Sequence, residues 1–315
     1  MVLIEEEMGL HTVILGPTGS GKSSLLILTI LQLLFQGVGL SLIDPDSKTA
    51  DDTMAHIAAY AERLNPLALR NIYYLNPSTG VTFSYDPCAT KLTGRDYDNW
   101  LYTRIEAIAR IFGRKQGIAN YKDQMRRDRV LRDVLYMCCT KGKDGKYFGL
   151  HRLFDCLNMG NDNRLKMFNR VCDFLPTYIA RDLWRINKMS VRDRYYEIES
   201  TLNIVTAFLS PLVVEMLSGK APTLDIHSIV RNNGTILAGL SETTGFSKEN
   251  GCAIGSMLIN DIEDACYAIK QRHFLIVEES DKMLGQDIGD LLRRARKRKL
   301  SVILSAGSLG AFKQL

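Results

Sequence analysis

Eight residues near the start of the chain, Gly16 to Ser23, read GPTGSGKS and fit the pattern G-x-x-x-x-G-K-[ST]. Glycines allow the tight turns that point successive backbone N–H groups at phosphate oxygens. In such loops the lysine reaches the β- and γ-phosphates of a nucleotide, and the following hydroxyl ligates magnesium. We predict that ATP is bound by Gly16, Pro17, Thr18, Gly19, Ser20, Gly21, Lys22, Ser23 and Ser24, and that Ser23 also binds Mg²⁺.

Two adjacent carboxylates, Glu278 and Glu279, follow the apolar run His273–Val277. That run is typical of a buried central strand, and ligands of parallel sheets bind beyond the carboxyl ends of the strands. Both carboxylates should therefore lie beside the phosphate loop. We expect Glu278 to hold the magnesium and its water shell, and Glu279 to polarise the attacking water as a general base, with Asp281 as a weaker candidate. The alternative is a solvated glutamate pair at a strand end.

A third carboxylate, Asp44, ends another apolar run and is followed by Pro45-Asp46. Its position next to the phosphate loop would let it contact the metal shell. An aspartate before proline also commonly holds a turn. The sequence leaves the role of Asp44 open and favours a turn role for Asp46.

The elements that must position these residues alternate between strand and helix patterns, which predicts an α/β fold with a mostly parallel central sheet. The expected strands are His11–Leu15, Leu40–Ile43, Asn71–Leu75, Thr235–Leu240, His273–Val277 and Leu300–Ser305. The expected helices of this part are Ser24–Phe35, Asp51–Leu64, Cys252–Tyr267 and Asp287–Lys297.

The middle of the chain has a different character, because strand patterns vanish and amphipathic helix patterns dominate. These helices are expected at Asn99–Phe112, Arg126–Cys139, Arg164–Leu175 and Ile198–Phe208. We therefore predict an ATPase core formed by residues 1–90 and 225–315, interrupted by a basic all-helical insertion at 91–224. Residues 91–200 contain 23 Lys and Arg against 14 Asp and Glu, although the whole chain has a net charge of only +5.

Basic residues with aromatic neighbours form two clusters in this insertion, and such clusters can bind phosphates and stack on bases. The first contains Arg126, Arg127, Arg129 and Arg132 near Tyr121 and Lys122. The second contains Arg181, Arg185, Lys188, Arg192 and Arg194 with Trp184, Tyr195 and Tyr196. We predict contact with DNA, single- or double-stranded; the alternative is an ordinary helix surface.

Membrane and secreted classes are disfavoured. The apolar run Ser24–Ile43 has the length of a membrane span, but Gln and Gly residues interrupt it and it follows a phosphate loop. The N-terminus is acidic, unlike a signal peptide. Seven cysteines without a C-x-x-C pair favour reduced, mostly buried thiols over a zinc site or a disulfide framework. We expect a cytoplasmic protein without a transmembrane segment, attached to the inner face of a membrane only through missing segments or partners.

Together these motifs resemble the HerA/FtsK superfamily of P-loop ATPases, especially HerA-like helicases and TraG/TraD-type conjugative coupling proteins. The resemblance lies in the phosphate loop with its preceding His11, in Ile43–Asp46, loosely in Val81–Pro87, in Thr235–Ser241 and in Val277–Ser280. It covers the two α/β parts of the chain and matches the helical middle only in type and position.

The resemblance implies a RecA-like ATPase core and a homo-hexameric ring that threads DNA, with ATP between subunits. Arg296, in the Arg296-Lys297 pair, would then be a catalytic arginine finger that acts on the neighbouring subunit's ATP, with Arg294 and Arg298 as rivals. The expected function is an ATP-hydrolysing motor that translocates DNA, in a conjugation or secretion machinery.

Two features depart from the family. Gly307 stands where relatives carry a glutamine or asparagine that senses the γ-phosphate, and Ser305 or Ser308 would have to substitute for it. The chain also starts shortly before the loop and stops soon after the last motif, so we expect a fragment or a short version. The alternatives are a secretion ATPase that acts on proteins and an ATP-binding assembly module with little turnover. A small-molecule kinase is disfavoured because no paired-arginine lid is recognisable.

Overall fold

A computed structural model describes residues 11–63, 69, 71–77, 80, 83–90, 92–113, 121–158, 162–283 and 288–308. That description leaves out the side chains of residues 121, 122, 162, 163, 282 and 288. Residues 81 and 82, which begin the predicted motif at 81–87, also lie outside the described residues. The chain forms two compact units, one made of residues 1–83 and 222–315 and the other of residues 84–221. Each is described by itself.

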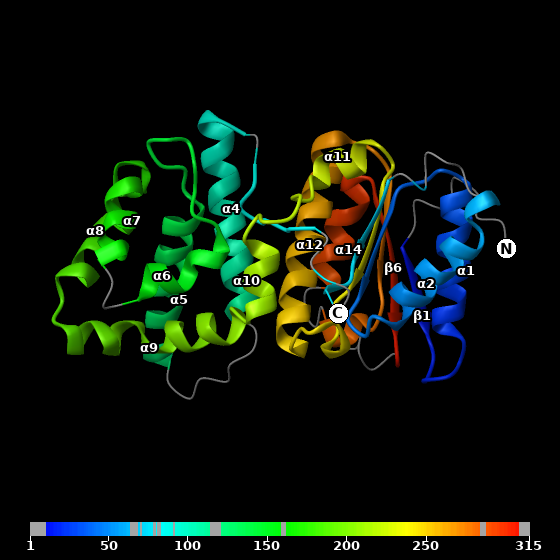
Figure 1. Ribbon diagram of the computed structural model, residues 1–315, viewed down its shortest axis with the longest axis horizontal. Coiled ribbons are helices and arrows are strands. Elements are labelled where there is room, and N and C mark those ends of the chain that lie inside the picture. Colours follow the sequence, from blue (N-terminus) through cyan, green and yellow to red (C-terminus); the bar gives the residue numbers. More distant parts are fainter. Residues whose placement is uncertain are drawn as a thin grey trace. The chain divides into compact units, whose positions relative to one another are not determined.

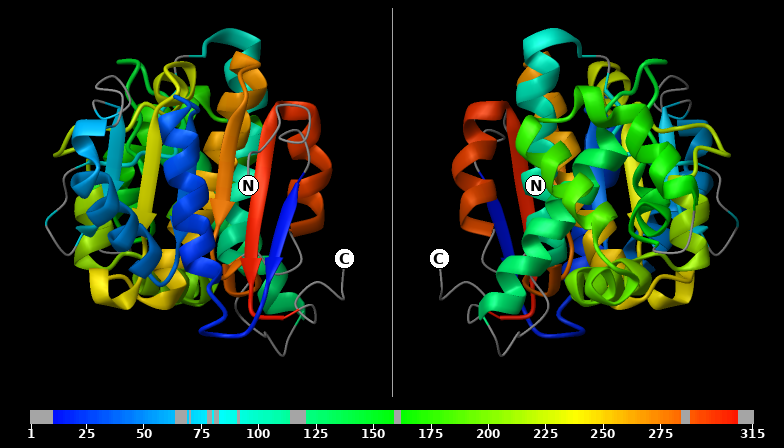
Figure 2. Two further views of the ribbon diagram at one scale, coloured as in Figure 1. Left: turned by 90° about the vertical axis from the view of Figure 1, so that its right-hand side faces the viewer. Right: turned by 90° about the vertical axis from the view of Figure 1, so that its left-hand side faces the viewer.

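The first unit is built on a six-stranded sheet whose strand pairs are all parallel. The strands are β1 (Thr12–Leu15), β2 (Leu40–Asp44), β3 (Ile72–Leu75), β4 (Thr235–Gly239), β5 (His273–Val277) and β6 (Leu300–Ala306). Their order across the sheet is β1-β6-β5-β2-β4-β3, which can be followed in Figure 2. The predicted parallel α/β fold is thus confirmed. β6, the last strand in sequence, separates the strand before the phosphate loop from the strand before Glu278.

Helices cover both faces of this sheet, as Figure 1 shows. On one face lie α1 (Lys22–Phe35) and α2 (Lys48–Ala59); on the other lie α12 (Lys248–Ile269) and α14 (Ile288–Ala295). The helix α11 (Ile226–Arg231) packs on α12, and the short elements η2 (Ala61–Arg63), η6 (Glu242–Thr244), α13 (Ser280–Met283) and η8 (Arg296–Arg298) complete the unit. Leu26, Ile30 and Leu33 of α1 are fully buried among Leu42, Leu237 and Ile276 of the sheet. This packing makes α1 a rigid continuation of the phosphate loop.

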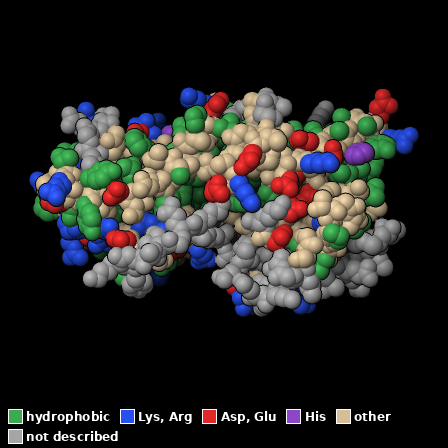
Figure 3. Space-filling model, turned by 90° about the horizontal axis from the view of Figure 1, so that it is seen from below, with side chains coloured by type: hydrophobic (Ala, Val, Ile, Leu, Met, Phe, Trp, Pro, Cys, Tyr) green, Lys and Arg blue, Asp and Glu red, His purple; other side chains and the backbone are tan. Residues whose placement is uncertain are grey.

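The second unit consists of helices around a central one, α5 (Tyr121–Cys139), which packs against α4, α6, α8 and α9. The surrounding elements are α4 (Gly94–Gly113), η4 (Leu150–Arg152), α6 (Leu153–Leu157), α7 (Asp162–Val171), η5 (Cys172–Phe174), α8 (Thr177–Lys188), α9 (Val191–Phe208) and α10 (Pro211–Leu217). In the view of Figure 3, hydrophobic and basic side chains gather side by side at the left of this unit.

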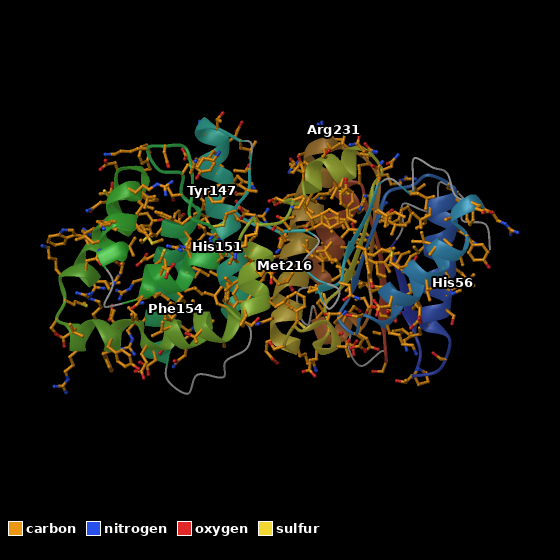
Figure 4. The ribbon with its side chains drawn as sticks, viewed as in Figure 1. His56, Tyr147, His151, Phe154, Met216 and Arg231 are labelled. Atoms are coloured by element: carbon orange, nitrogen blue, oxygen red, sulfur yellow. A yellow bond between two sulfur atoms is a disulfide. The ribbon has the colours of Figure 1, made fainter. Side chains whose placement is uncertain are left out.

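The segment that enters the second unit is fixed to the end of α5. The structure joins Cys88 and Cys139 in a disulfide, with a Cα–Cα distance of 5.4 Å, so the expectation of reduced thiols is wrong at this pair. The two cysteines are 51 residues apart, and spacing alone could not show that tertiary packing brings them together. Asp86 accepts a hydrogen bond of 2.6 Å from the Tyr147 hydroxyl, labelled in Figure 4. Burial raises the pKa of Asp86.

Several helices differ from the prediction at their ends. The pattern read as one helix at Arg164–Leu175 ends at Val171, and a further helix, α8, begins after Pro176. Proline fixes its own backbone but suits the first turn of a helix, so it marks a new start here. Among the described residues, no single helix could cross a membrane by length and composition, while one sharply bent pair, Val191–Phe208 with Pro211–Leu217, meets that test.

Candidate active site

The predicted phosphate loop connects β1 directly to α1. Gly19 and Gly21 have φ angles of 83° and 88°, a left-handed conformation that side chains other than glycine's rarely adopt. A Cβ at Gly16 would lie 2.4 Å from the Ser20 hydroxyl, so a larger residue there would have to displace the Ser20 side chain. Gly21 precedes the first residue of α1, and therefore the N-terminal end of the helix with its free N–H groups opens at the loop.

The Lys22 side chain is held by the loop itself. The Lys22 ammonium donates hydrogen bonds to the carbonyl oxygens of Gly16 (2.7 Å) and Pro17 (3.2 Å), which places the positive charge across the loop. Thr18, Ser20 and Ser24 are exposed, and Ser23 is half-buried. The loop thus presents backbone N–H groups, an ammonium and hydroxyls on one short stretch, which is the set that a polyphosphate requires.

The central contact of the site joins Ser23 to Glu278. The Ser23 hydroxyl donates a hydrogen bond of 2.6 Å to a carboxylate oxygen of Glu278, across 255 residues of sequence. Glu278 is only 5% exposed, and its other oxygen, Oε2, is buried without a hydrogen-bond partner among the described residues. A buried carboxylate oxygen without a partner is costly, and a bound cation would offset that cost. The structure therefore brings together the two residues predicted to bind the metal.

Asp44 lies on the next strand and is engaged in holding a turn. One of its oxygens accepts a hydrogen bond from the Asp46 N–H and the other from the Ala50 N–H in the first turn of α2, both at 2.9 Å. Burial, followed by the nearby charge of Glu278, raises the pKa of Asp44 to about 7. The question that the sequence left open is thus answered for this state: Asp44 caps the start of α2.

Glu279 directly follows Glu278 beyond the end of β5. It is half-buried, and its φ of 46° is unusual for a residue other than glycine. A left-handed conformation costs on the order of 1–3 kcal/mol, and such residues cluster at functional sites. The weaker candidate, Asp281, lies in α13 with a buried, unpartnered Oδ1.

Just beyond β6 lies Gly307, where the sequence departs from the family pattern. Gly307 is exposed in open space and offers no side chain to a nucleotide. Ser305 is fully buried, pairs in register with Ile14 of β1, and has a hydroxyl without a hydrogen-bond partner. Of the two serines that the sequence offered in place of the missing side chain, Ser305 is buried and Ser308 is exposed.

Arg296 lies far from the loop of its own chain. It begins η8, which precedes the amino end of β6, whereas the phosphate loop lies at the carboxyl end, where the Gly16 N–H donates to the Ala306 carbonyl. The seven residues of β6 separate the two ends by about 20 Å. The structure does not bring Arg296 together with Lys22, Ser23 and Glu278 in one chain.

The rivals of Arg296 are bound to α12. Arg294 donates two hydrogen bonds to Glu263, at 2.9 and 3.1 Å, and Arg298 contacts Glu263 and Asp264. Glu263 is 2% exposed. Among the described residues Arg296 has neither an ion pair nor a hydrogen bond, and it is exposed. Sequence reasoning missed Glu263, although a carboxylate within a helix of small and apolar residues was a usable signal.

His11, directly before β1, links α14 to β6. One ring nitrogen hydrogen-bonds the Leu292 carbonyl of α14 (2.9 Å), and the other accepts from the Val302 N–H of β6 (3.3 Å). Burial lowers the pKa of His11, which favours the neutral ring that these two bonds require.

No protein-family model and no curated protein matches the chain. Solved structures do. TrwBdeltaN70, a bacterial conjugative coupling protein in an unbound form, matches with a TM-score of 0.62 and 15% identity over 98% of this chain and 65% of that one. TrwB in complex with ADP and Mg²⁺ matches with a TM-score of 0.59 and 16% identity, over 98% of this chain and 67% of that one. VirB4 of Thermoanaerobacter pseudethanolicus matches with a TM-score of 0.50 and 14% identity, over 96% and 71%.

The chain thus spans 65% of the length of the unbound TrwB structure. Identities near 15% establish a shared fold and nothing finer. At the level of the fold, the likeness to coupling proteins that the motifs indicated is confirmed: this chain has the RecA-like P-loop fold of the conjugative coupling protein TrwB.

Proposed function

We propose that this chain is an ATP-hydrolysing motor domain that translocates DNA, of the HerA/TraG coupling type. The observation that carries the proposal is the hydrogen bond from Ser23 to the buried Glu278. It joins the end of a phosphate loop to a carboxylate two strands away in the sheet, which is the arrangement that nucleotide hydrolysis needs.

The residues of the site fit ATP with Mg²⁺. A serine hydroxyl and a carboxylate are hard oxygen ligands, which Mg²⁺ prefers, and Glu278 Oε2 has no partner within the described residues. Mg²⁺ would neutralise charge on the β- and γ-phosphates. Structures of TrwB hold an ATP analogue in one case and ADP with Mg²⁺ in another, which supports the same choice here.

Each residue then has a defined part in hydrolysis. The loop N–H groups and Lys22 hold the phosphates, Ser23 and Glu278 hold the metal and its waters, and Glu279 accepts a proton from the water that attacks the γ-phosphorus. The half-buried position of Glu279 leaves it accessible to that water.

Arg296 would act on the nucleotide of an adjacent subunit. Its distance of about 20 Å from its own loop excludes a role within one chain, because an arginine side chain cannot span that gap. Arg294 and Arg298 are bound to Glu263, whereas Arg296 has no ion pair or hydrogen bond among the residues that the structure describes. Head-to-tail contacts of this kind close into rings, which supports a homo-hexamer.

DNA as the substrate, and conjugation or secretion machinery as the setting, are supported by the family resemblance and by the excess of basic residues in the helical part. A second candidate is an ATP-binding assembly module with little turnover. Gly307, which lacks a sensing side chain, favours it.

The deciding experiment measures ATP hydrolysis with and without DNA, over protein concentrations that change the oligomeric state, with Lys22→Ala as the blank. A motor should turn over faster with DNA and with concentration, and should lose turnover in Lys22→Ala. ATP binding without turnover that responds to DNA would reject the motor in favour of the assembly module.

A further inference from the structure

Most basic residues that the sequence grouped on α5 are neutralised within the helical unit. Arg127 is buried and paired with Asp128, Arg129 with Glu197, and Arg132 with Glu106. Arg126 pairs with Asp123 and lies over the Tyr196 ring. Paired arginines attract phosphates weakly, because the neighbouring carboxylate cancels their charge. The first predicted cluster is therefore a poor surface for nucleic acid.

The next helix, α8, is different. Arg181, Trp184 and Lys188 are three and four residues apart, so they share the exposed side of the helix, opposite the buried Ile179 and Leu183. Trp184 is 55% exposed, and the Lys188 ammonium lies 5.5 Å from the centre of its ring. Within the described part of the chain, Arg181 has no ion pair or hydrogen bond.

The first turns of α9 also carry exposed basic and aromatic side chains. Arg192 is exposed, as are Tyr195 and Tyr196, the last at 63%. We call Arg181, Trp184, Lys188, Arg192, Tyr195 and Tyr196 the α8–α9 face.

Among the described residues, no carboxylate forms an ion pair with Arg181, Lys188 or Arg192. Asp182 and Glu197 are engaged by Arg129 and Arg185. Asp193 accepts a hydrogen bond from the Ser190 hydroxyl, and the exposed Glu199 lies two helical turns after Arg192. Three cations without an ion pair in the described part of the chain therefore lie between exposed aromatic rings, on two consecutive helices.

We propose that the α8–α9 face binds single-stranded nucleic acid, with bases stacked on Trp184 and the tyrosines and phosphates on Arg181, Lys188 and Arg192. This inference rests on the proposed function and specifies its substrate. An aromatic ring can stack only on a base that is exposed, and duplex bases are already stacked on each other, so the rings favour a single strand. Basic residues alone would bind single-stranded and double-stranded nucleic acid alike.

Trp184 provides the measurement. The chain has two tryptophans, so Trp100→Phe leaves Trp184 as the sole tryptophan, which can be excited selectively over the tyrosines. Stacking of a base should quench its emission. We expect saturable quenching by a thymidine oligonucleotide of about 15 residues, and at least tenfold weaker binding of a blunt duplex of the same length.

Three variants separate stacking from charge. Trp184→Ala, followed by anisotropy of a labelled oligonucleotide, should weaken binding about 5- to 150-fold and leave its salt dependence unchanged. The double variant Arg181→Ala, Lys188→Ala should reduce the slope of log affinity against log salt by about 1.4, the value for two phosphates of a single strand. Tyr102→Ala is the matched control, since Tyr102 on α4 is as exposed as Trp184, at 56%. It should bind like the parent.

The outcomes distinguish this inference from the proposed function. ATP hydrolysis that depends on Lys22 but is accompanied by no quenching, or by equal losses in Tyr102→Ala and Trp184→Ala, would overturn the α8–α9 face and leave the motor standing. Equal binding of duplex and single strand would overturn the stacking. If Trp184→Ala instead shifts the oligomeric state without changing binding, the face is a contact between copies of the chain.

Discussion

Replacement of Arg296 by alanine tests the proposed assembly most directly. Arg296 is exposed and unpaired within the described residues, so its loss should leave the fold intact. Arginine fingers contribute about 10³-fold or more to the rate of hydrolysis, and we expect a loss of turnover of that size with little change in ATP binding. Lys297→Ala is the matched control, because it removes the adjacent exposed cation.

Mixing two inactive proteins reveals whether Arg296 acts between subunits. In the proposed assembly, each complete site takes Lys22 from one chain and Arg296 from the next, since β6 keeps the two about 20 Å apart in a single chain. In a random equal mixture of Lys22→Ala and Arg296→Ala, a site is complete when one subunit retains Lys22 and the adjacent subunit retains Arg296. Each condition is met in about half of the cases. The mixture should therefore regain about a quarter of the wild-type rate, although neither parent is active.

The assay is steady-state phosphate release from the mixture at a fixed total protein concentration, above the concentration at which the wild-type rate per subunit stops rising. A mixture as inactive as its parents would refute the reasoning, provided that the two variants coassemble. Full activity of Arg296→Ala alone would refute it more simply.

Further predictions concern Glu263, Glu279 and His273. Glu263→Gln should lower kcat and leave KM for ATP nearly unchanged, because it releases Arg294 and with it the segment that carries Arg296. An unchanged kcat would show that the ion pair between Glu263 and Arg294 does not position Arg296. Glu279→Gln should abolish turnover while fluorescent-nucleotide binding persists, and full turnover would transfer the base role to another group such as Asp281. Complete burial lowers the pKa of His273 to about 3, so the folded protein takes up no proton there while the unfolded chain does below pH 6.5. The stability advantage of the wild type over His273→Gln should accordingly shrink by about 1.4 kcal/mol per pH unit between pH 6 and pH 4 in urea titrations, and a constant difference would contradict a buried neutral ring.

Local patterns were enough to predict the phosphate loop and the strands beside it. The loop sits where glycines permit left-handed angles, and β5 is a run of five buried residues that ends at Glu278. Both features depend on a few consecutive residues. The contact of Ser23 with Glu278 could be anticipated because parallel strands bring their carboxyl ends to one edge.

Features that depend on distant pairing were not predictable in this way. No local signal shows that β6 inserts between β1 and β5, or that Cys88 meets Cys139. The basic clusters illustrate the same limit. Arg129 and Arg181 look alike in the sequence, yet only the fold shows that Arg129 is paired with Glu197 and Arg181 is not. Charge counted along the sequence overstates the charge that a partner meets.

The position of β6 has a consequence for how such a motor works. One end of the strand lies beside the phosphate loop, where Ser305 pairs with Ile14 of β1, and the other end continues from η8, which begins at Arg296. A strand hydrogen-bonded on both sides moves as a unit rather than bending, so a displacement at the nucleotide edge would reach the opposite edge. The contact that joins these two different edges in adjacent copies is heterologous, and it repeats until a ring closes. If Arg296 acts on the adjacent subunit as proposed, turnover should rise with protein concentration even without DNA, because an isolated chain would then hold only half of each catalytic site.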